Sequence, residues 1–260
     1  MEIIEQRLGM TPGNADRTPW LLLHGAYRDA SAWEHVQADC DERGIASRAI
    51  SLPGHGTSTM HKGELQFYSI RDYVRIMLSE LEHATPKPIL IGHGLGAWLA
   101  LRAAEECELP GVVLIGPPPL GGMLGRALKT FARHPLWVIA NVASGFESPW
   151  LGSEAIAKYM LGDTPNGSES RCVLRELLHA PVAFPAQVTT PVLVLSSEQD
   201  KLVSARRHEQ LARSLPAATH GSIPGAPHDV YGLDWAGQLT ESIASWCASL
   251  ATSSSTLQTE

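Results

Sequence analysis

The stretch from Pro88 to Ala100 most constrains how this chain can fold, because an apolar run breaks into glycines and then into a helix-forming sequence. Residues 89–91 predict a buried strand, and residues 97–100 predict the first turn of a helix. The glycines between them stand two apart, which predicts a tight turn. The stretch therefore indicates a strand, a tight turn and a helix in immediate succession.

Two motifs that carry chemistry fit this unit. In Gly-x-Ser-x-Gly, the outer glycines let strand and helix approach closely, and the central residue is a nucleophile at the tip of a strained turn. Gly92 and Gly96 match the outer glycines, whereas Gly94 stands at the nucleophile position. The same residues fit a dinucleotide fingerprint, which requires an acidic residue at the end of the next strand. The next predicted strand, 112–115, ends in Gly116 and prolines, which argues against a nucleotide site.

Strands and helices are predicted to alternate along the chain. Apolar runs predict further strands near residues 20–23, 46–52, 112–115, 191–195 and 219–223. Helical spacing of apolar residues predicts helices near residues 32–43, 69–83, 206–215 and 234–250. This alternation predicts a mostly parallel sheet covered by helices on both faces, with functional residues at the carboxyl ends of the strands.

The 260 residues are enough for one large α/β domain. We expect a core built from residues 1–116 and 186–251. Residues 117–185, which begin with a Pro- and Gly-rich stretch, are expected to form a helical insertion over that core. The polar residues 252–260 are expected to be a disordered tail.

Composition narrows the function classes. The formal net charge of −7 argues against nucleic acid or an anionic membrane as a partner, since both attract basic patches. The four cysteines are widely spaced and form no Cys-x-x-Cys pair, so neither a zinc site nor a disulfide framework is predicted. The first residues do not resemble a signal peptide and no apolar run is long enough to span a membrane, so a cytoplasmic protein is expected.

Five motifs in a fixed order give the chain a family resemblance. They are His24-Gly25-Ala26 with Trp33, Pro53-Gly54-His55-Gly56, Gly92-His93-x-Leu95-Gly96, Gln199-Asp200 with Val203, and Gly225-x-Pro227-His228. In this order the chain resembles the α/β-hydrolase fold family, and in particular its small esterase-like members. The resemblance spans nearly the whole chain, with residues 117–185 as the variable cap.

The resemblance implies roles for individual residues. His228 would be the general base and acid, and Asp200 would hold its second ring nitrogen and fix its tautomer. The backbone N–H groups of Ala26 and Leu95 would form an oxyanion hole, which does not depend on the side chain at position 94. The departure from the family pattern is Gly94, which leaves the nucleophile position without a reactive group.

Other residues compete for these roles or extend them. Glu198 is an alternative to Asp200 as the carboxylate that holds His228. The Asp-x-x-Val spacing to Val203 favours Asp200. Tyr27 and Trp150 are candidates for substrate contact, although Trp150 also fits the core of the cap. His93 is expected to point into packing, and no cofactor or metal ion is expected.

The expected substrate is a small, apolar acyl or carbonyl compound such as a carboxylic ester, a lactone or a thioester. Three explanations of Gly94 stay open. The chain is an inactivated or drifted serine hydrolase, or an enzyme that works without a nucleophile (a lyase, a cyclase or a general-base hydrolase that uses His228), or a binder of small molecules without catalysis.

The absence of an acidic residue after the 112–115 strand generates a first prediction. We expect no saturable binding of NADH at micromolar concentrations, because nothing at that strand end can hold the nucleotide ribose. Titration of the protein with NADH, followed by nicotinamide fluorescence, measures this directly. A micromolar dissociation constant would restore the dinucleotide interpretation of the glycine turn.

Overall fold

The central element is a mostly parallel β-sheet. The computed structural model describes residues 6–8, 18–60, 64–133, 135–136, 139, 167–179 and 183–256. Within them a seven-stranded sheet runs in the order β1-β3-β2-β4-β5-β6-β7. Its strands are β1 (Gln6–Leu8), β2 (Trp20–Leu23), β3 (Ser47–Ile50), β4 (Ile89–His93), β5 (Val112–Ile115), β6 (Val192–Ser197) and β7 (Ala218–Ile223). Strands β2 to β7 pair in parallel and β1 pairs antiparallel with β3, which confirms the predicted sheet.

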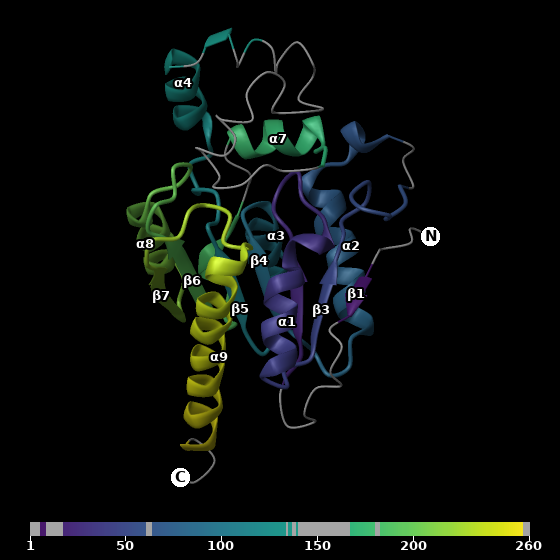
Figure 1. Cartoon of the computed structure of the whole chain (residues 1–260), viewed down its shortest axis with the longest axis vertical. Helices are drawn as coiled ribbons and strands as arrows, with labels where there is room; N and C mark the ends of the chain where they lie inside the picture. The colour runs from purple at the N-terminus through teal and green to yellow at the C-terminus, as the bar shows by residue number, and fades with distance from the viewer. Residues whose placement is uncertain are drawn as a thin grey trace.

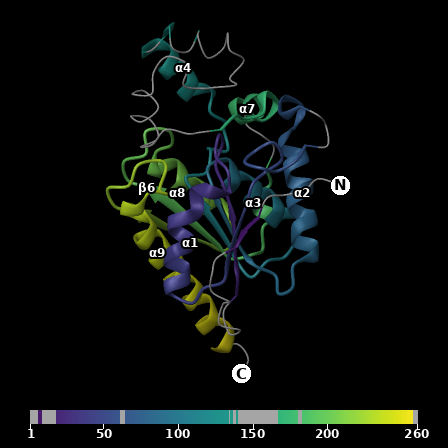
Figure 2. The ribbon, with the colours of Figure 1, turned by 45° about the vertical axis from the view of Figure 1, so that its right-hand side comes forward.

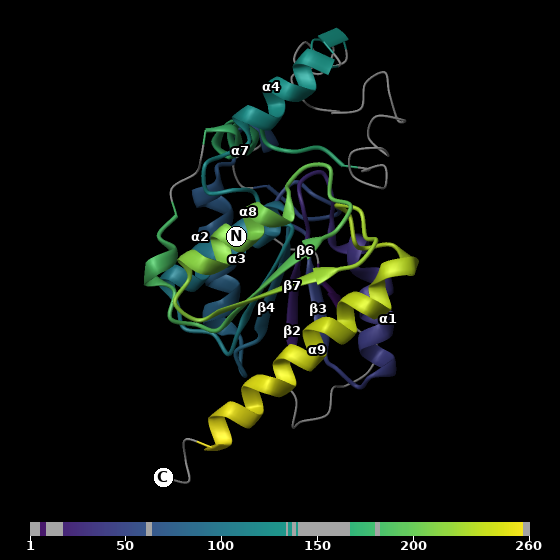
Figure 3. The ribbon, with the colours of Figure 1, turned by 90° about the vertical axis from the view of Figure 1, so that its left-hand side faces the viewer.

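Helices cover both faces of the sheet (Figures 1, 2 and 3). On one face lie α1 (Glu34–Glu42) and α9 (Leu233–Thr256), and on the other lie α2 (Ile70–His83), α3 (Leu95–Glu106) and α8 (Ala205–Ser214). In the described part of the chain, short 3₁₀ helices lie in the connections: η1 (Ala30–Trp33), η2 (Leu65–Phe67) and η3 (Pro185–Gln187).

The continuous apolar runs of the inner strands follow from this two-sided cover. Along β4, Leu90 packs into the core beneath α2 and α3, whereas Ile89 and Ile91 pack into the core beneath α1 and α9. Successive residues of a strand point to opposite faces, so a strand buried on both faces needs apolar residues at every position.

The turn between β4 and α3 is the tightest approach of a helix to the sheet. A Cβ atom at Gly92 would overlap the carbonyl group of Gly96 one helical turn later. A Cβ atom at Gly96 would lie 2.6 Å from the carbonyl oxygen of His24 and would overlap that of Leu23 at the end of β2. The missing side chains therefore let α3 begin directly against two strand ends.

Two predicted boundaries differ from the structure. Helix α9 continues to Thr256, so residues 252–256 are helical where a disordered tail was expected from residue 252. No glycine or proline interrupts the Ser- and Thr-rich end of this helix, and its backbone hydrogen bonds continue regardless of polarity. The helix predicted at 32–43 is divided into η1 and α1, with the Asp29 side chain as the cap of η1.

The segment expected to form a cap is described only in part. Helices α4 (Leu124–Arg133) and α7 (Arg171–Leu178) lie beyond the carboxyl ends of the strands, as Figure 1 shows at the top of the molecule. Residues 140–166 lie outside the described residues. Among the helices described, none combines the length and the apolar character needed to cross a membrane.

The close approach at Gly96 generates a stability prediction. Gly96→Ala should lower the free energy of unfolding by about 1–3 kcal/mol or more, because its Cβ meets rigid backbone atoms. Gly125→Ala on α4 is the matched control, since among the described residues no atom beyond its own stretch of helix lies within 4 Å of its added Cβ. That control should be neutral or stabilising by about 0.5–1 kcal/mol. Equal urea midpoints for the two variants would contradict the account of the turn.

Candidate active site

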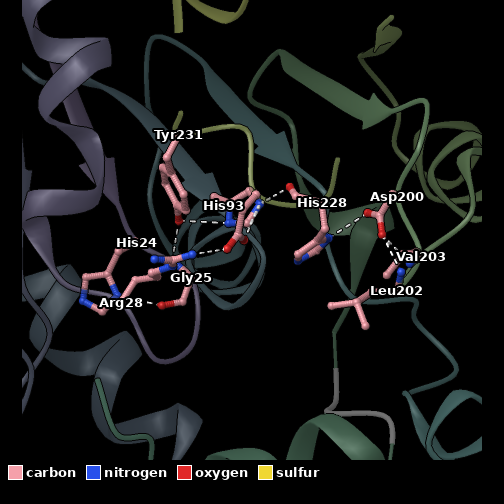
Figure 4. A network of polar contacts seen from close by, with 10 residues as sticks. His24, Gly25, Arg28, His93, Asp200, Leu202, Val203, His228 and Tyr231 are labelled. Atoms are coloured by element: carbon pink, nitrogen blue, oxygen red, sulfur yellow. Dashed lines mark hydrogen bonds and ion pairs between the residues drawn. The ribbon is translucent and has the colours of Figure 1, made fainter. Parts of the chain in front are cut away.

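The centre of the site is the pair formed by His228 and Asp200. His228 follows β7 and Asp200 follows β6, and the Nδ1 atom of His228 lies 2.7 Å from Oδ2 of Asp200 (Figure 4). The other carboxylate oxygen of Asp200 accepts hydrogen bonds from the backbone N–H groups of Leu202, at 2.6 Å, and Val203, at 2.9 Å. The structure thus brings together two residues that are far apart in sequence, and the backbone fixes the carboxylate that orients the ring.

Electrostatics favour the charged form of both partners. Burial opposes the charge on His228, but the charge of Asp200 and their hydrogen bond outweigh it, so the pKa of His228 lies above its ordinary 6.5. Burial also opposes the charge on Asp200, yet His228 and the two backbone donors bring the pKa of its carboxyl below the ordinary 3.8. The imidazole is therefore more basic than a free histidine, which suits a group that takes up a proton.

Gly94 lies between β4 and α3 with φ +54° and ψ −114°. Its N–H donates to the carbonyl of Ile115 at 2.9 Å and its carbonyl accepts from Trp98 N–H at 3.2 Å, so both sides of the turn are held. A Cβ atom built on Gly94 would lie 3.7 Å from His228 Nε2 and 3.8 Å from the Cα of Gly25. A side chain at this position would therefore face the free nitrogen of the imidazole.

The turn after β2, which contains Gly25 and Ala26, lies beside Gly94. The carbonyl of Gly25 accepts from the ring Nδ1 of His24 at 2.8 Å and from the N–H of Arg28 at 3.3 Å. Because C=O and N–H point in opposite directions across a trans peptide, the N–H of Ala26 points away from these partners. Among the described residues, no backbone carbonyl accepts from the N–H groups of Ala26 or Leu95. The role of these two N–H groups as oxyanion donors stays a prediction.

The structure places two of the other candidate residues, Glu198 and Tyr27, but does not describe Trp150. Glu198 is exposed and its carboxylate accepts from the N–H of Gly225 at 2.7 Å, whereas Asp200 contacts His228. Tyr27 adopts φ +62°, which is uncommon for a residue with a side chain, and its carbonyl accepts from the N–H of Gly167 at 3.1 Å. Trp150 lies outside the described residues.

Sequence analysis missed a polar network behind the site. Arg28 and Asp229 form a buried ion pair, which joins the turn after β2 to the residue after His228. Tyr231 accepts a hydrogen bond from Gly25 N–H at 2.8 Å and lies 2.9 Å from Nδ1 of His93. His93 is buried as expected, but it is a hydrogen-bonding residue as well as a packing residue. Tyr231 carried no motif that could have singled it out.

A second missed group fixes the end of the cap segment to the core. Glu169 is buried 3.4 Å from the Nε2 atom of His55 and accepts a hydrogen bond from the hydroxyl of Tyr73 at 3.1 Å. Burial opposes both charges, but the pair raises the pKa of His55 and lowers that of Glu169. The adjacent Ser170 hydroxyl donates to the carbonyl of Tyr68. These contacts hold the chain immediately before α7.

The same region contains a group of side chains with metal-ligating atoms. His93, His228 and Asp229 place such atoms within 4.8 Å of one another. His93 Nε2 lies 2.8 Å from the carbonyl oxygen of His228, and Asp229 pairs with Arg28. Their protein partners account for this arrangement, so we derive no metal site from it.

Comparison with known proteins places this geometry in a family. The model of the alpha/beta hydrolase family matches residues 20–236, which is most of the chain. The chain belongs to the α/β-hydrolase family. The family's core thus includes every strand of the parallel part of the sheet and the residues described above.

Individual relatives have several different activities. A 2-succinyl-6-hydroxy-2,4-cyclohexadiene-1-carboxylate synthase of Serratia proteamaculans is 29% identical over 236 residues, covering 81% of this chain and 89% of the relative. A monoacylglycerol lipase of Mycolicibacterium smegmatis is 23% identical over 258 residues, covering 92% and 91%. A carboxylesterase structure from Nitrososphaera gargenis has a TM-score of 0.72 at 15% identity, covering 97% and 96%, and this likeness shows the shared fold.

The contact between Asp200 and His228 generates a prediction for the titration of the imidazole. Asp200→Asn should lower the pKa of His228, because burial then acts without the negative charge of Asp200 and without its charge-assisted hydrogen bond. Glu198→Gln is the control and should leave this pKa unchanged, since Glu198 bonds to Gly225 instead. The measurement is an NMR titration of the ring Cε1–H signal. A His228 pKa that is insensitive to Asp200→Asn would contradict the described pairing.

Proposed function

We propose that this protein is an α/β-hydrolase enzyme for a small carboxylic ester, lactone or thioester, in which His228 acts as a general base without a covalent intermediate. One observation carries the proposal. The Cβ position of Gly94 lies 3.7 Å from His228 Nε2, and among the described residues the Cα of Gly25 is the one other atom within 4 Å, leaving aside the two chain neighbours of Gly94. In this proposal the attacking water occupies that position, beside Nε2 of His228.

The chemistry follows from the roles of these groups. His228 Nε2 takes a proton from water while the water oxygen forms a bond to the substrate carbonyl carbon. Negative charge develops on the carbonyl oxygen, where the N–H groups of Ala26 and Leu95 stabilise it. The tetrahedral intermediate then expels the alcohol or thiol, which receives the proton from His228. Asp200 keeps Nδ1 protonated and stabilises the imidazolium that forms in between.

The expected rate is low compared with that of a serine hydrolase. In a serine protease, loss of the nucleophile alone cost about 10⁶ in kcat and left roughly 10³–10⁴ over the uncatalysed reaction. The remaining rate came from the oxyanion hole and from binding, and this chain retains candidates for both. Its own pair of His228 and Asp200 adds a base that can activate water.

A second candidate function uses the same base on a different proton. If His228 removes a proton from carbon next to a carbonyl, the two N–H groups stabilise an enolate, which leads to elimination or cyclisation. The relative from Serratia proteamaculans, named as a synthase, favours keeping this candidate. Neither function requires a side chain at position 94.

The proposal is tested by a set of variants assayed on p-nitrophenyl esters, lactones and β-dicarbonyl compounds. The natural chain should hydrolyse activated esters slowly, and His228→Ala and Asp200→Asn should both lower that rate. Gly94→Ser should raise the rate by up to about 10⁶, the factor that loss of the nucleophile cost in the serine protease, and should make the chain react with a fluorophosphonate probe. Because only neutral His228 accepts a proton, the rate should rise with pH through the raised pKa of His228 and then become constant.

Gly94→Ala is the matched control for the serine variant. Both variants add a Cβ atom at φ +54° and therefore share the same backbone strain, but only serine adds a nucleophile. Gly94→Ala should fill the space for water, lower the slow natural rate and leave the probe unreactive. Ester turnover that survives His228→Ala would overturn the proposal, and turnover only of β-dicarbonyl compounds would favour the second candidate. Ligand binding unaffected by all of these changes, with no turnover, would indicate a binding protein.

A further inference from the structure

A chain of hydrogen bonds connects the three turns that build the site. Gly25, in the turn after β2, donates its N–H to the Tyr231 hydroxyl oxygen at 2.8 Å (Figure 4). That oxygen lies 2.9 Å from Nδ1 of His93, which is the last residue of β4. The other ring nitrogen of His93 lies 2.8 Å from the backbone carbonyl oxygen of His228. The side chains of Tyr231 and His93 thus connect the turn at Gly25, the end of β4 and the loop that carries His228.

The direction of each bond is fixed by what its partners can do. Gly25 N–H can only donate, so the Tyr231 oxygen accepts from it and directs its own proton to Nδ1 of His93. The carbonyl oxygen of His228 can only accept, so Nε2 of His93 carries the proton that it donates there. One tautomer of neutral His93 satisfies both contacts. Burial, followed by the nearby charge of His228, lowers the pKa of His93 to about 4, which keeps the ring neutral.

The hydrogen bonds connect the peptide groups around Gly25 with the main chain of His228, and these segments carry the predicted oxyanion donor Ala26 and the base. Gly25 precedes Ala26, and its carbonyl is held by His24 and by Arg28 N–H, so both peptide groups around Gly25 have fixed orientations. On the other side, the bond to the His228 carbonyl fixes the main chain that carries the imidazole. The chain of bonds therefore sets the separation between the oxyanion donor and the base.

Aromatic packing and an ion pair restrict the movement of the residues in this hydrogen-bond chain. The ring of Tyr231 meets Trp33 edge-to-face, with ring centroids 4.9 Å apart and an interplanar angle of 89°. The Arg28–Asp229 ion pair runs alongside and joins the same two loops a second time. Tyr231, His93 and Asp229 are all buried, so their hydrogen bonds do not compete with solvent.

We propose that Tyr231 and His93 are positioning residues, which hold the base His228 and the oxyanion donor Ala26 at a fixed separation through the chain from Gly25 N–H to the His228 carbonyl. The effect on turnover rests on the proposed function, whereas the hydrogen-bond chain itself does not. Neither residue touches the reacting atoms, so their loss should slow the reaction with little effect on substrate affinity.

The first test observes the hydrogen-bond chain without any substrate. In the natural protein, ¹⁵N NMR of the histidine side chains should show His93 protonated at Nε2 and unprotonated at Nδ1, with no titration between pH 5 and pH 9. In Tyr231→Phe, the Nδ1 signal should lose the shift caused by its hydrogen bond. A His93 ring protonated at Nδ1, or charged at neutral pH, would overturn the proposal.

The second test measures whether the two loops are fixed together. Tyr231→Phe keeps the aromatic ring and removes only the hydroxyl group. It should increase deuterium uptake in both peptides, residues 24–28 and residues 226–232. Tyr73→Phe is the matched control, because it removes a buried tyrosine hydroxyl that bonds to Glu169 instead. Increased uptake confined to residues 226–232 would show a local role and would contradict the proposal.

The third test measures turnover of a p-nitrophenyl ester. Tyr231→Phe should lower kcat roughly 10-fold with KM unchanged, since small misplacements of catalytic groups cost rate more than binding. Tyr73→Phe should leave both constants unchanged. His93→Gln supplies an amide donor in place of Nε2 and should retain more of kcat than His93→Leu, which has none. Equal kcat for the natural chain and Tyr231→Phe would overturn the positioning role.

The outcomes separate this proposal from the proposed function. If the natural chain hydrolyses no ester, and Gly94→Ser does not react with a fluorophosphonate, the proposed function fails. The NMR and exchange measurements then decide the hydrogen-bond chain alone. If the natural chain is active but Tyr231→Phe and Tyr73→Phe behave alike in all three tests, the proposed function holds and the positioning role is wrong.

Discussion

The site depends on the absence of side chains at Gly92 and Gly96, which lets helix α3 begin in contact with the ends of two strands. A Cβ atom at either position would collide with backbone, which cannot move aside as a flexible side chain can. This close approach brings the turn at Gly94 beside Gly25 and opposite His228. The positions of the turns that carry the site are thus determined by backbone packing. The polar contacts then form between residues that these turns bring together.

Hydrogen bonds and ion pairs between polar groups then hold the side chains of the site in place. Asp200 holds the imidazole of His228 from one side, and the carbonyl of His228 is held by His93 from the other. Burying charges and hydrogen-bonding groups is costly unless each has a partner, so these networks form only when the surrounding turns are correctly placed. The pairs Arg28–Asp229 and His55–Glu169 follow the same rule, and each joins segments that are distant in sequence.

Sequence alone predicted the features that arise from local patterns. The spacing of apolar residues located strands β2 to β7 and helix α2, but not the short antiparallel strand β1, and the parallel sheet then implied that Asp200 and His228 would converge. The contacts of His93 with Tyr231 and of His55 with Glu169 could not be predicted, because they join residues more than 100 positions apart. Nothing near Tyr231 or Glu169 distinguishes them from ordinary packing residues. The end of α9 was placed too early because polar residues were taken as a helix end.

The conformation of Gly94 has a consequence for how this chain can evolve. The positive φ angle of Gly94 and the hydrogen bonds on both sides of the turn are made by the backbone, although a side chain at position 94 would be strained at this φ. Glycine and serine codons can differ by a single base. A single base change can therefore place a hydroxyl group at position 94, where its Cβ atom would lie 3.7 Å from His228 Nε2, without any other change in the sequence.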